Sequence, residues 1–278
     1  MTSGHGRLPD FLVIGAMRSG TSSLARYLRA HPSICLGTKK EVHFFDRNFD
    51  KGTPWYVSHF PCAHPGHLTG EATQTYLFDE EALDRMASVV PDARLIVVLR
   101  HPVDRAYSHY WLNRARGREQ LEFEHAIDAE AGRIRDGGLN ERFWYSYLGR
   151  GRYAGQLTAV TKRYSRDQVL VHLFEDLRDS PEATYASICR FLGIEDGFRP
   201  PNLGSVVNPY VTFRSVRLRG FSQRLPAGLH RVVGRLNTRS GSYPPMEGAL
   251  RRRLLDEFEA EIASLESWLG RDLSSWRT

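Results

Sequence analysis

The feature that most constrains this chain is a glycine-spaced turn between a buried strand and a helix near its N-terminus. A continuous apolar run at 11–14 is followed by Gly15 and Gly20 at the spacing of a phosphate-binding loop, and 22–30 has the apolar spacing of a helix. In such a turn, backbone N–H groups and the N-terminus of the helix can hold a phosphate. The order strand, glycine loop, helix therefore predicts an α/β fold with an anion site at the start of the helix.

Two further mostly apolar segments, RLIVVL at 94–99 and VLVHL at 169–173, indicate buried strands. They alternate with segments of helical character, found at 103–114, 153–164 and 181–192. Strands that alternate with helices favour a mostly parallel sheet that is covered on both faces. We therefore expect an α/β, P-loop-like three-layer fold with a central, mostly parallel sheet flanked by helices.

The C-terminal part of the chain has a further helical pattern. Its apolar residues at helical spacing are Leu254, Leu255, Phe258, Ile262, Leu265 and Leu269. Gly270, directly after this run, is a typical helix end. With 278 residues, 41% of them apolar, and no internal repeats, the chain has the size of a single domain over 1–278, in which 1–10 is expected to be a flexible N-terminus.

No segment of the sequence predicts a membrane span or a secretion signal. No stretch approaches the ~20 apolar residues that cross a bilayer, and the first ten residues carry no apolar run. The three cysteines, Cys35, Cys62 and Cys189, are odd in number and lack motif spacing, so they predict neither a disulfide framework nor a zinc site. We therefore expect a soluble, cytoplasmic protein without stable membrane insertion.

Positive charge is concentrated in the segment 199–245, which contains no acidic residue. Its eight arginines exceed the net charge of the whole chain, +6. Gly, Pro, Ser and Asn are frequent there, so we expect a loop-rich segment that lies over the active site. Such a segment fits a phosphate- or sulfate-bearing ligand or an anionic membrane surface, and an ordinary solvated surface is the alternative. Aromatic residues are few and no nucleic-acid-binding module is present, so we expect no nucleic-acid partner.

The glycine loop differs from that of an ATP-binding protein in two ways. Thr21 stands where a triphosphatase has the lysine that contacts the β- and γ-phosphates, and the strand at 94–99 ends in Arg100 instead of a Mg²⁺-binding aspartate. The loop therefore suits a single phosphate-type group, with Arg18 as its cation. Arg100 and Ser108 are expected at the carboxyl edge of the sheet, where open α/β folds bind ligands.

A second polar cluster follows the first helix, in the sequence KKEVHFFD at 39–46. Strand alternation would place Glu41, His43 and Phe45 on one face. A carboxylate beside a phosphate loop can take the proton of an acceptor, and a neighbouring histidine can orient that acceptor. A solvated strand edge is the alternative interpretation of this pair on its own.

Three segments together resemble the family of sulfotransferases that use 3′-phosphoadenosine 5′-phosphosulfate (PAPS). They are FLVIGAMRSGTSSLARYLRAHP, KKEVHFFD and RLIVVLRHPVDRAYSHY, in this order. The likeness is nearest to the heparan sulfate 3-O-sulfotransferase and N-sulfotransferase branch and its bacterial relatives. Fainter matches, which extend it over most of the chain, are GEATQTYLF at 70–78, GRYAGQL at 151–157, FEDLRDSPEATYASICRFLGI at 174–194 and LGRDLSSW at 269–276.

The resemblance implies PAPS as the donor, adenosine 3′,5′-bisphosphate as its product, and no metal. The implied donor site consists of Ala16, Met17, Arg18, Ser19, Gly20, Thr21, Ser22 and Ser23 around the 5′-phosphosulfate, Arg100 and Ser108 at the 3′-phosphate, and Arg239 as a further phosphate contact. The implied catalytic residues are Glu41 as the base, His43 and Asp46 in its support, and Arg18 at the bridging oxygen. Glu71 and Thr73 would lie on the acceptor side.

Two positions depart from the family pattern. Arg18 replaces the usual lysine, which keeps the charge but presents a planar fork in place of a compact ammonium. Ala72 stands where the heparan enzymes have a lysine that faces a sulfated sugar. The second departure weakens the case for a heparan-like acceptor.

The sequence thus predicts an enzyme that transfers a sulfuryl group to a hydroxyl of a carbohydrate, lipid or secondary metabolite. Two other classes stay open. A P-loop nucleotide kinase or triphosphatase is disfavoured by Thr21 and Arg100, and a non-catalytic anion- or glycan-binding module leaves Glu41 unexplained. The expected partner is a small-molecule or glycan acceptor; its identity, transfer to oxygen or nitrogen, and the oligomeric state are left open by the sequence.

Overall fold

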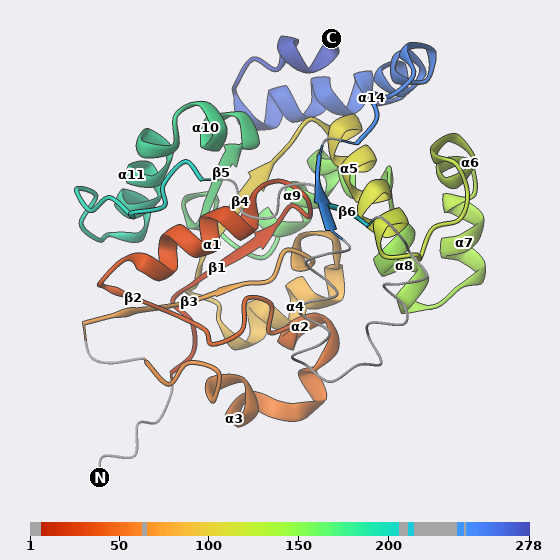
Figure 1. Ribbon diagram of the computed structural model, residues 1–278. Coiled ribbons are helices and arrows are strands. Elements are labelled where there is room, and N and C mark those ends of the chain that lie inside the picture. Colours follow the sequence, from red (N-terminus) through yellow and green to blue (C-terminus); the bar gives the residue numbers. More distant parts are fainter. Residues whose placement is uncertain (1–6, 63–65, 206–210, 214–237, 242) are drawn as a thin grey trace. The chain divides into compact units, whose positions relative to one another are not determined.

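The computed structural model describes residues 7–62, 66–205, 211–213, 238–241 and 243–278 (Figure 1). The chain divides into two compact units. The first comprises Met1–His101, Arg152–Val207 and Ala260–Thr278, and the second comprises Pro102–Gly151 and Asn208–Glu259. Most of the basic segment 199–245 and the first six residues of the predicted flexible N-terminus lie outside the described residues. A single domain over 1–278 stays a prediction.

A five-stranded sheet in the order β2-β3-β1-β4-β5 forms the centre of the first unit. Its strands are β1 (Phe11–Gly15), β2 (Ile34–Leu36), β3 (Leu68–Ala72), β4 (Arg94–Leu99) and β5 (Val169–Leu173). All four neighbouring pairs are parallel. The predicted α/β, P-loop-like fold with a parallel central sheet is confirmed, and the carboxyl ends of the strands meet at one edge.

Apolar side chains on both faces of the sheet are buried, which explains why β1 and β4 are continuous apolar runs. On one face, Phe11 and Val13 of β1 pack with side chains of α1 (Thr21–Ala30) and α11 (Pro181–Leu192) in one core cluster. The residues that alternate with them, such as Leu12, are equally buried. The sheet is therefore a rigid base for the loops that follow its strands.

The other elements of the first unit are short helices around this sheet (Figure 1). They are α2 (Phe44–Arg47), α3 (Gly52–Val57), α4 (Glu80–Val89), α9 (Tyr153–Thr161), α10 (Phe174–Asp179) and the 3₁₀ helices η1 (Phe49–Lys51), η2 (Tyr76–Phe78), η4 (Arg166–Gln168) and η5 (Ser274–Arg277). The strands and helices predicted over 11–30, 94–114 and 153–192 are confirmed, although α9 ends three residues early, at Thr161.

The second unit is mainly helical. Its elements are α5 (Pro102–Ala115), α6 (Phe123–Asp128), α7 (Glu130–Asp136), α8 (Leu139–Tyr145), η3 (Gly149–Gly151) and the antiparallel pair β6 (Val211–Phe213) and β7 (Thr238–Ser240). The C-terminal helix α14 (Gly248–Leu269) runs from the second unit into the first. Gly270 follows it with a φ of 62°, as the sequence predicts.

A disulfide joins Cys35 in β2 to Cys62, which follows α3, and their Cα atoms are 5.4 Å apart. The prediction that the cysteines form no disulfide was therefore wrong. A separation of 27 residues matches no motif, and only the fold brings the two positions together. Disulfides persist mainly in oxidising compartments, so the cysteines no longer support a cytoplasmic location. Among the described residues, none of the helices has the length and apolar character needed to cross a membrane.

The disulfide is expected to stabilise the first unit by restricting its unfolded chain. Replacing both cysteines (Cys35→Ser with Cys62→Ser) should lower the free energy of unfolding by about 2–4 kcal/mol, because a cross-link over a loop of this length removes that much chain entropy. Urea unfolding without reductant measures the loss. The same comparison in dithiothreitol is the control, and a loss that persists there would show that the serines act by another route.

Candidate active site

The phosphate-type loop lies between the end of β1 and the start of α1, at the carboxyl edge of the sheet. The backbone N–H of Ala16 donates to Val98 O at 2.8 Å, which fastens the loop to β4. Gly20 has a φ of 86°, and a Cβ there would come within 3.1 Å of the Phe174 ring, so any other residue would be strained and crowded. Arg18 is also left-handed, with a φ of 72°. The sequence therefore forms a tight, sterically fixed turn.

The start of α1 suits an anion. Its first turn contains no acidic residue, and its N-cap, Gly20, provides no side-chain cap. Ser19 is fully buried, and its Oγ has no hydrogen-bond partner within the described part of the chain. Such an orphaned hydroxyl in a turn of N–H groups fits a phosphate oxygen.

Arg100 lies beside this loop, as expected for the end of β4. Its Nη1 donates to Arg18 O at 3.3 Å, and its guanidinium carbon lies 5.0 Å from the centre of the Phe174 ring. Ser108 in α5 and Arg239 in β7 belong to the second unit, and their part in donor binding stays a prediction. Among the described residues, no group of three or more His, Cys, Asp or Glu side chains could hold a metal ion.

The segment 40–46, called the base segment below, is not a strand. Residues 41–43 are irregular, His43 is left-handed with a φ of 54°, and α2 starts at Phe44. Strand alternation was therefore the wrong guide to its side chains. The edge strand β2 ends before this segment, at Leu36, so the segment lacks a neighbouring ladder and takes its shape from side-chain hydrogen bonds.

The buried carboxylate of Glu71 holds the base segment from inside. It accepts hydrogen bonds from the hydroxyls of Tyr56, Thr73 and Tyr76. Burial raises the pKa of Glu71, while these three bonds act in the opposite direction.

Two of these hydroxyls also accept backbone bonds. Thr73 Oγ1 accepts from the N–H of Val42 at 3.2 Å, and Tyr76 Oη accepts from the N–H of Phe44 at 2.9 Å. Glu71 and Thr73, which the sequence assigned to the acceptor side, are 1% and 0% exposed. Their contacts fit residues that position the base segment.

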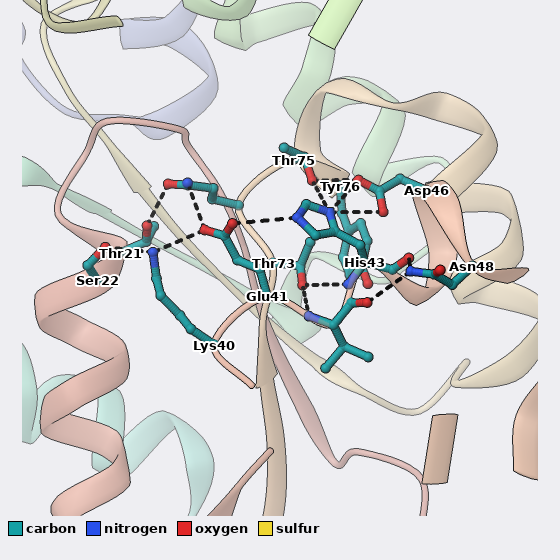
Figure 2. A network of polar contacts seen from close by, with 12 residues as sticks. Thr21, Ser22, Lys40, Glu41, His43, Asp46, Asn48, Thr73, Thr75 and Tyr76 are labelled. Atoms are coloured by element: carbon teal, nitrogen blue, oxygen red, sulfur yellow. Dashed lines mark hydrogen bonds and ion pairs between the residues drawn. The ribbon is translucent and has the colours of Figure 1, made fainter. Parts of the chain in front are cut away.

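Glu41, His43 and Asp46 form a row of alternating charge (Figure 2). His43 Nε2 lies 3.5 Å from Glu41 Oε2, and His43 Nδ1 lies 3.0 Å from Asp46 Oδ2. The Thr75 hydroxyl donates to Asp46 Oδ2 at 2.7 Å. The structure thus brings together the three residues that the sequence grouped as a base and its support.

The charges in this row stabilise one another. Burial raises the pKa of Glu41, but the contact with His43 and the charge of Lys40 outweigh burial and lower this pKa from 4.5 to about 2. Burial lowers the pKa of His43, whereas the bonds and charges of Asp46 and Glu41 raise it from 6.5 to about 9. At neutral pH Glu41 is therefore ionised and His43 is an imidazolium.

Two residues that the sequence did not single out connect Glu41 to α1. Gln74 Nε2 donates to Glu41 Oε1 at 2.8 Å, and Gln74 Oε1 accepts from Thr21 Oγ1 at 3.0 Å. Lys40 Nζ donates to Glu41 Oε1 at 3.0 Å and to Ser22 Oγ at 2.6 Å (Figure 2). Lys40 was visible as part of the KKEVHFFD cluster, but no local pattern marks Gln74, which is 33 positions from Glu41.

A sequence model described as "Sulfotransferase domain" matches residues 8–208. The chain belongs to the sulfotransferase family. The match spans the glycine loop, the base segment and β1 to β5, so the resemblance inferred from three motifs is confirmed. The chain is therefore assigned to the sulfotransferases, and not to the P-loop kinases and triphosphatases or to a family of binding modules.

Several proteins of this family resemble the chain over nearly all its length. A solved structure, "Crystal Structure of Sulfotransferase from Alicyclobacillus acidocaldarius", is 30% identical, with a TM-score of 0.76, and the match covers 98% of this chain and 100% of that one. The human "Bifunctional heparan sulfate N-deacetylase/N-sulfotransferase 2" is 32% identical over 97% of this chain. The chain spans only 31% of that relative's length.

Another relative represents the second heparan sulfate branch. Human "Heparan sulfate glucosamine 3-O-sulfotransferase 3B1" is 33% identical over 69% of this sulfotransferase chain and 48% of its own length. An N-sulfotransferase and a 3-O-sulfotransferase are thus similar to this chain to about the same degree of identity. The comparison therefore supports the family and leaves the acceptor to other evidence.

Removing the hydroxyl of Tyr76 should loosen the base segment. Tyr76→Phe leaves Glu71 without one donor and the Phe44 N–H without its acceptor, so we expect a loss of about 1–3 kcal/mol in the free energy of unfolding and a lower kcat. Tyr164→Phe is the matched control, because the Tyr164 hydroxyl is also buried but bonds to Val90 O, away from the base segment. Equal kcat values for the two variants would contradict this role.

His43 should titrate well above an ordinary histidine. We expect its ring to lose its proton near pH 9, because two carboxylates stabilise the imidazolium. NMR titration of the histidine side chains measures this, and Asp46→Asn should lower the midpoint toward 6.5. A wild-type midpoint near 6.5 would show that the imidazolium is not held between two charges.

Proposed function

We propose that this chain is a PAPS-dependent sulfotransferase that transfers a sulfuryl group to an acceptor hydroxyl, with Glu41 as the base. The observation that carries the proposal is that side chains connect the first turn of α1 to the Glu41 carboxylate. Gln74 connects Thr21 to Glu41. Lys40 connects Ser22 to Glu41. An anion cradle and an ionised carboxylate thus lie next to each other. In-line transfer from a bound donor to an acceptor needs such an arrangement.

The residues at the start of α1 fit the donor. PAPS supplies the sulfuryl group, and adenosine 3′,5′-bisphosphate is left behind. The loop 16–23 would hold the 5′-phosphosulfate through its N–H groups and the hydroxyl of Ser19, which otherwise lacks a partner among the described residues. Arg100, together with Ser108 and Arg239, would hold the 3′-phosphate. This set needs no metal, because arginines and N–H groups offset the phosphate charge.

The proposed role of Glu41 is to take the proton of the acceptor hydroxyl as that oxygen bonds to sulfur. The bond between sulfur and the bridging oxygen breaks at the same time, and Arg18 and the loop N–H groups offset the charge on the departing phosphate. His43 orients Glu41 through Nε2, and Asp46 fixes His43 through Nδ1. Glu71 and Thr73 position this row by holding its backbone.

The proposed acceptor is a hydroxyl of a carbohydrate, lipid or secondary metabolite. The base segment matches the 3-O-transferring branch through Glu41, His43 and Asp46, which favours oxygen over nitrogen as the acceptor atom. The names of the curated relatives make glycans the first class of acceptor to screen. The buried Ala72 argues against a heparan-like sugar.

Glu41→Gln tests the proposal. We expect kcat to fall by ~10²–10⁴-fold, the usual contribution of a general base, because the amide cannot accept the proton. Calorimetric titration should show unchanged binding of adenosine 3′,5′-bisphosphate without metal. The exposed Glu182, at the start of α11, supplies the matched control, Glu182→Gln, which should keep full activity. Retained turnover in Glu41→Gln would reject Glu41 as the base, and a wild type that does not bind the nucleotide would reject the function.

A further inference from the structure

Lys40 lies between the anion cradle and the base. Its ammonium donates to Ser22 Oγ at 2.6 Å on the side of α1 and to Glu41 Oε1 at 3.0 Å on the other side (Figure 2). Its side chain is 33% exposed, so it can move without unpacking the interior. Two of its three N–H groups are used by these bonds.

Gln74 is the neutral counterpart of Lys40. It bonds to the same carboxylate oxygen, Glu41 Oε1, and reaches Thr21 at the start of α1. The second oxygen, Oε2, faces His43. Glu41 therefore stays held by Gln74 and His43 when Lys40 leaves it.

The row of contacts makes Glu41 a weak base as long as Lys40 stays. Burial raises the pKa of Glu41, but the contact with His43 and then the charge of Lys40 lower it to about 2. A general base works best when its pKa lies closer to the working pH. Withdrawing a cation from Glu41 at the time of transfer would raise its basicity when it is needed.

We propose that Lys40 is a catalytic residue of the sulfuryl transfer, whose ammonium turns from Glu41 to the oxygens of the transferred group. This inference rests on the proposed function. Sulfur must pass from the cradle to the acceptor oxygen beside Glu41, and Lys40 is bonded to Ser22 on the cradle side and to Glu41 on the acceptor side. A compact ammonium with three donors can bond the transferred oxygens and keep its contact with Ser22.

Three lysine variants separate this role from a general effect of charge. Lys40→Met should lower kcat by ~10²-fold, as the loss of one preorganised donor at a developing charge does. Adenosine 3′,5′-bisphosphate, which lacks the sulfuryl group, should bind with unchanged affinity. Lys39→Met removes the same charge from an exposed neighbour and should leave kcat unchanged. Lys40→Arg keeps the charge and should retain more of kcat than Lys40→Met.

NMR titration of the Glu41 carboxyl, without acceptor, gives a readout apart from turnover. In the wild type, PAPS should raise the Glu41 pKa, whereas adenosine 3′,5′-bisphosphate should not, because only PAPS offers Lys40 the sulfuryl oxygens. In Lys40→Met, the Glu41 pKa should already be raised in the free protein, and PAPS should add no further shift.

The results that would overturn this inference differ from the results that would overturn the proposed function. A wild type that binds and turns over PAPS while Lys40→Met keeps the kcat of Lys39→Met would overturn this inference alone. The same holds if both nucleotides shift the Glu41 pKa equally. A wild type that binds neither nucleotide would overturn the proposed function, and the inference with it.

Discussion

The geometry of the base segment depends on one buried carboxylate. Glu71 lies in β3 with three hydroxyls donating to it, and two of these hydroxyls, on Thr73 and Tyr76, hold the backbone N–H groups of 42–45. A buried carboxylate is costly unless its hydrogen bonds are satisfied. Two of the hydroxyls that satisfy Glu71 also accept from the backbone of the base segment, so the same groups hold the buried carboxylate and position that segment.

From this backbone, charges of alternating sign extend toward α1. Asp46, His43, Glu41 and Lys40 follow one another, with each cation beside a carboxylate. Within this row the neighbouring charges favour the ionised forms of Glu41 and His43, whose pKa values they lower and raise respectively. Moving the charge of Lys40 therefore changes the proton affinity of Glu41.

The sequence predicted those parts of the fold in which local pattern and burial agree. β1 is a continuous apolar run, β4 and β5 are mostly apolar, and the glycine loop has a fixed spacing. β3 was missed because its sequence, LTGEA, is polar, and its burial depends on partners from other segments. The sequence grouped Glu41, His43 and Asp46, which do lie together, but it did not predict their arrangement, since His43 is left-handed and α2 follows it. Gln74 was part of the segment GEATQTYLF but was not singled out, because its contacts with Glu41 and Thr21 arise only from the fold.

The Cys35–Cys62 bond closes a ring of chain that contains Lys40, Glu41, His43 and Asp46. The glycine loop and Arg100, which form the proposed donor side, lie outside this ring. The two halves of the site therefore differ in how they are cross-linked. The half with Glu41 lies within the disulfide-closed ring, whereas the half with the glycine loop has no cross-link of this kind. A thiol reductant acts directly on the half that carries the proposed base and leaves the proposed nucleotide-binding half covalently unchanged.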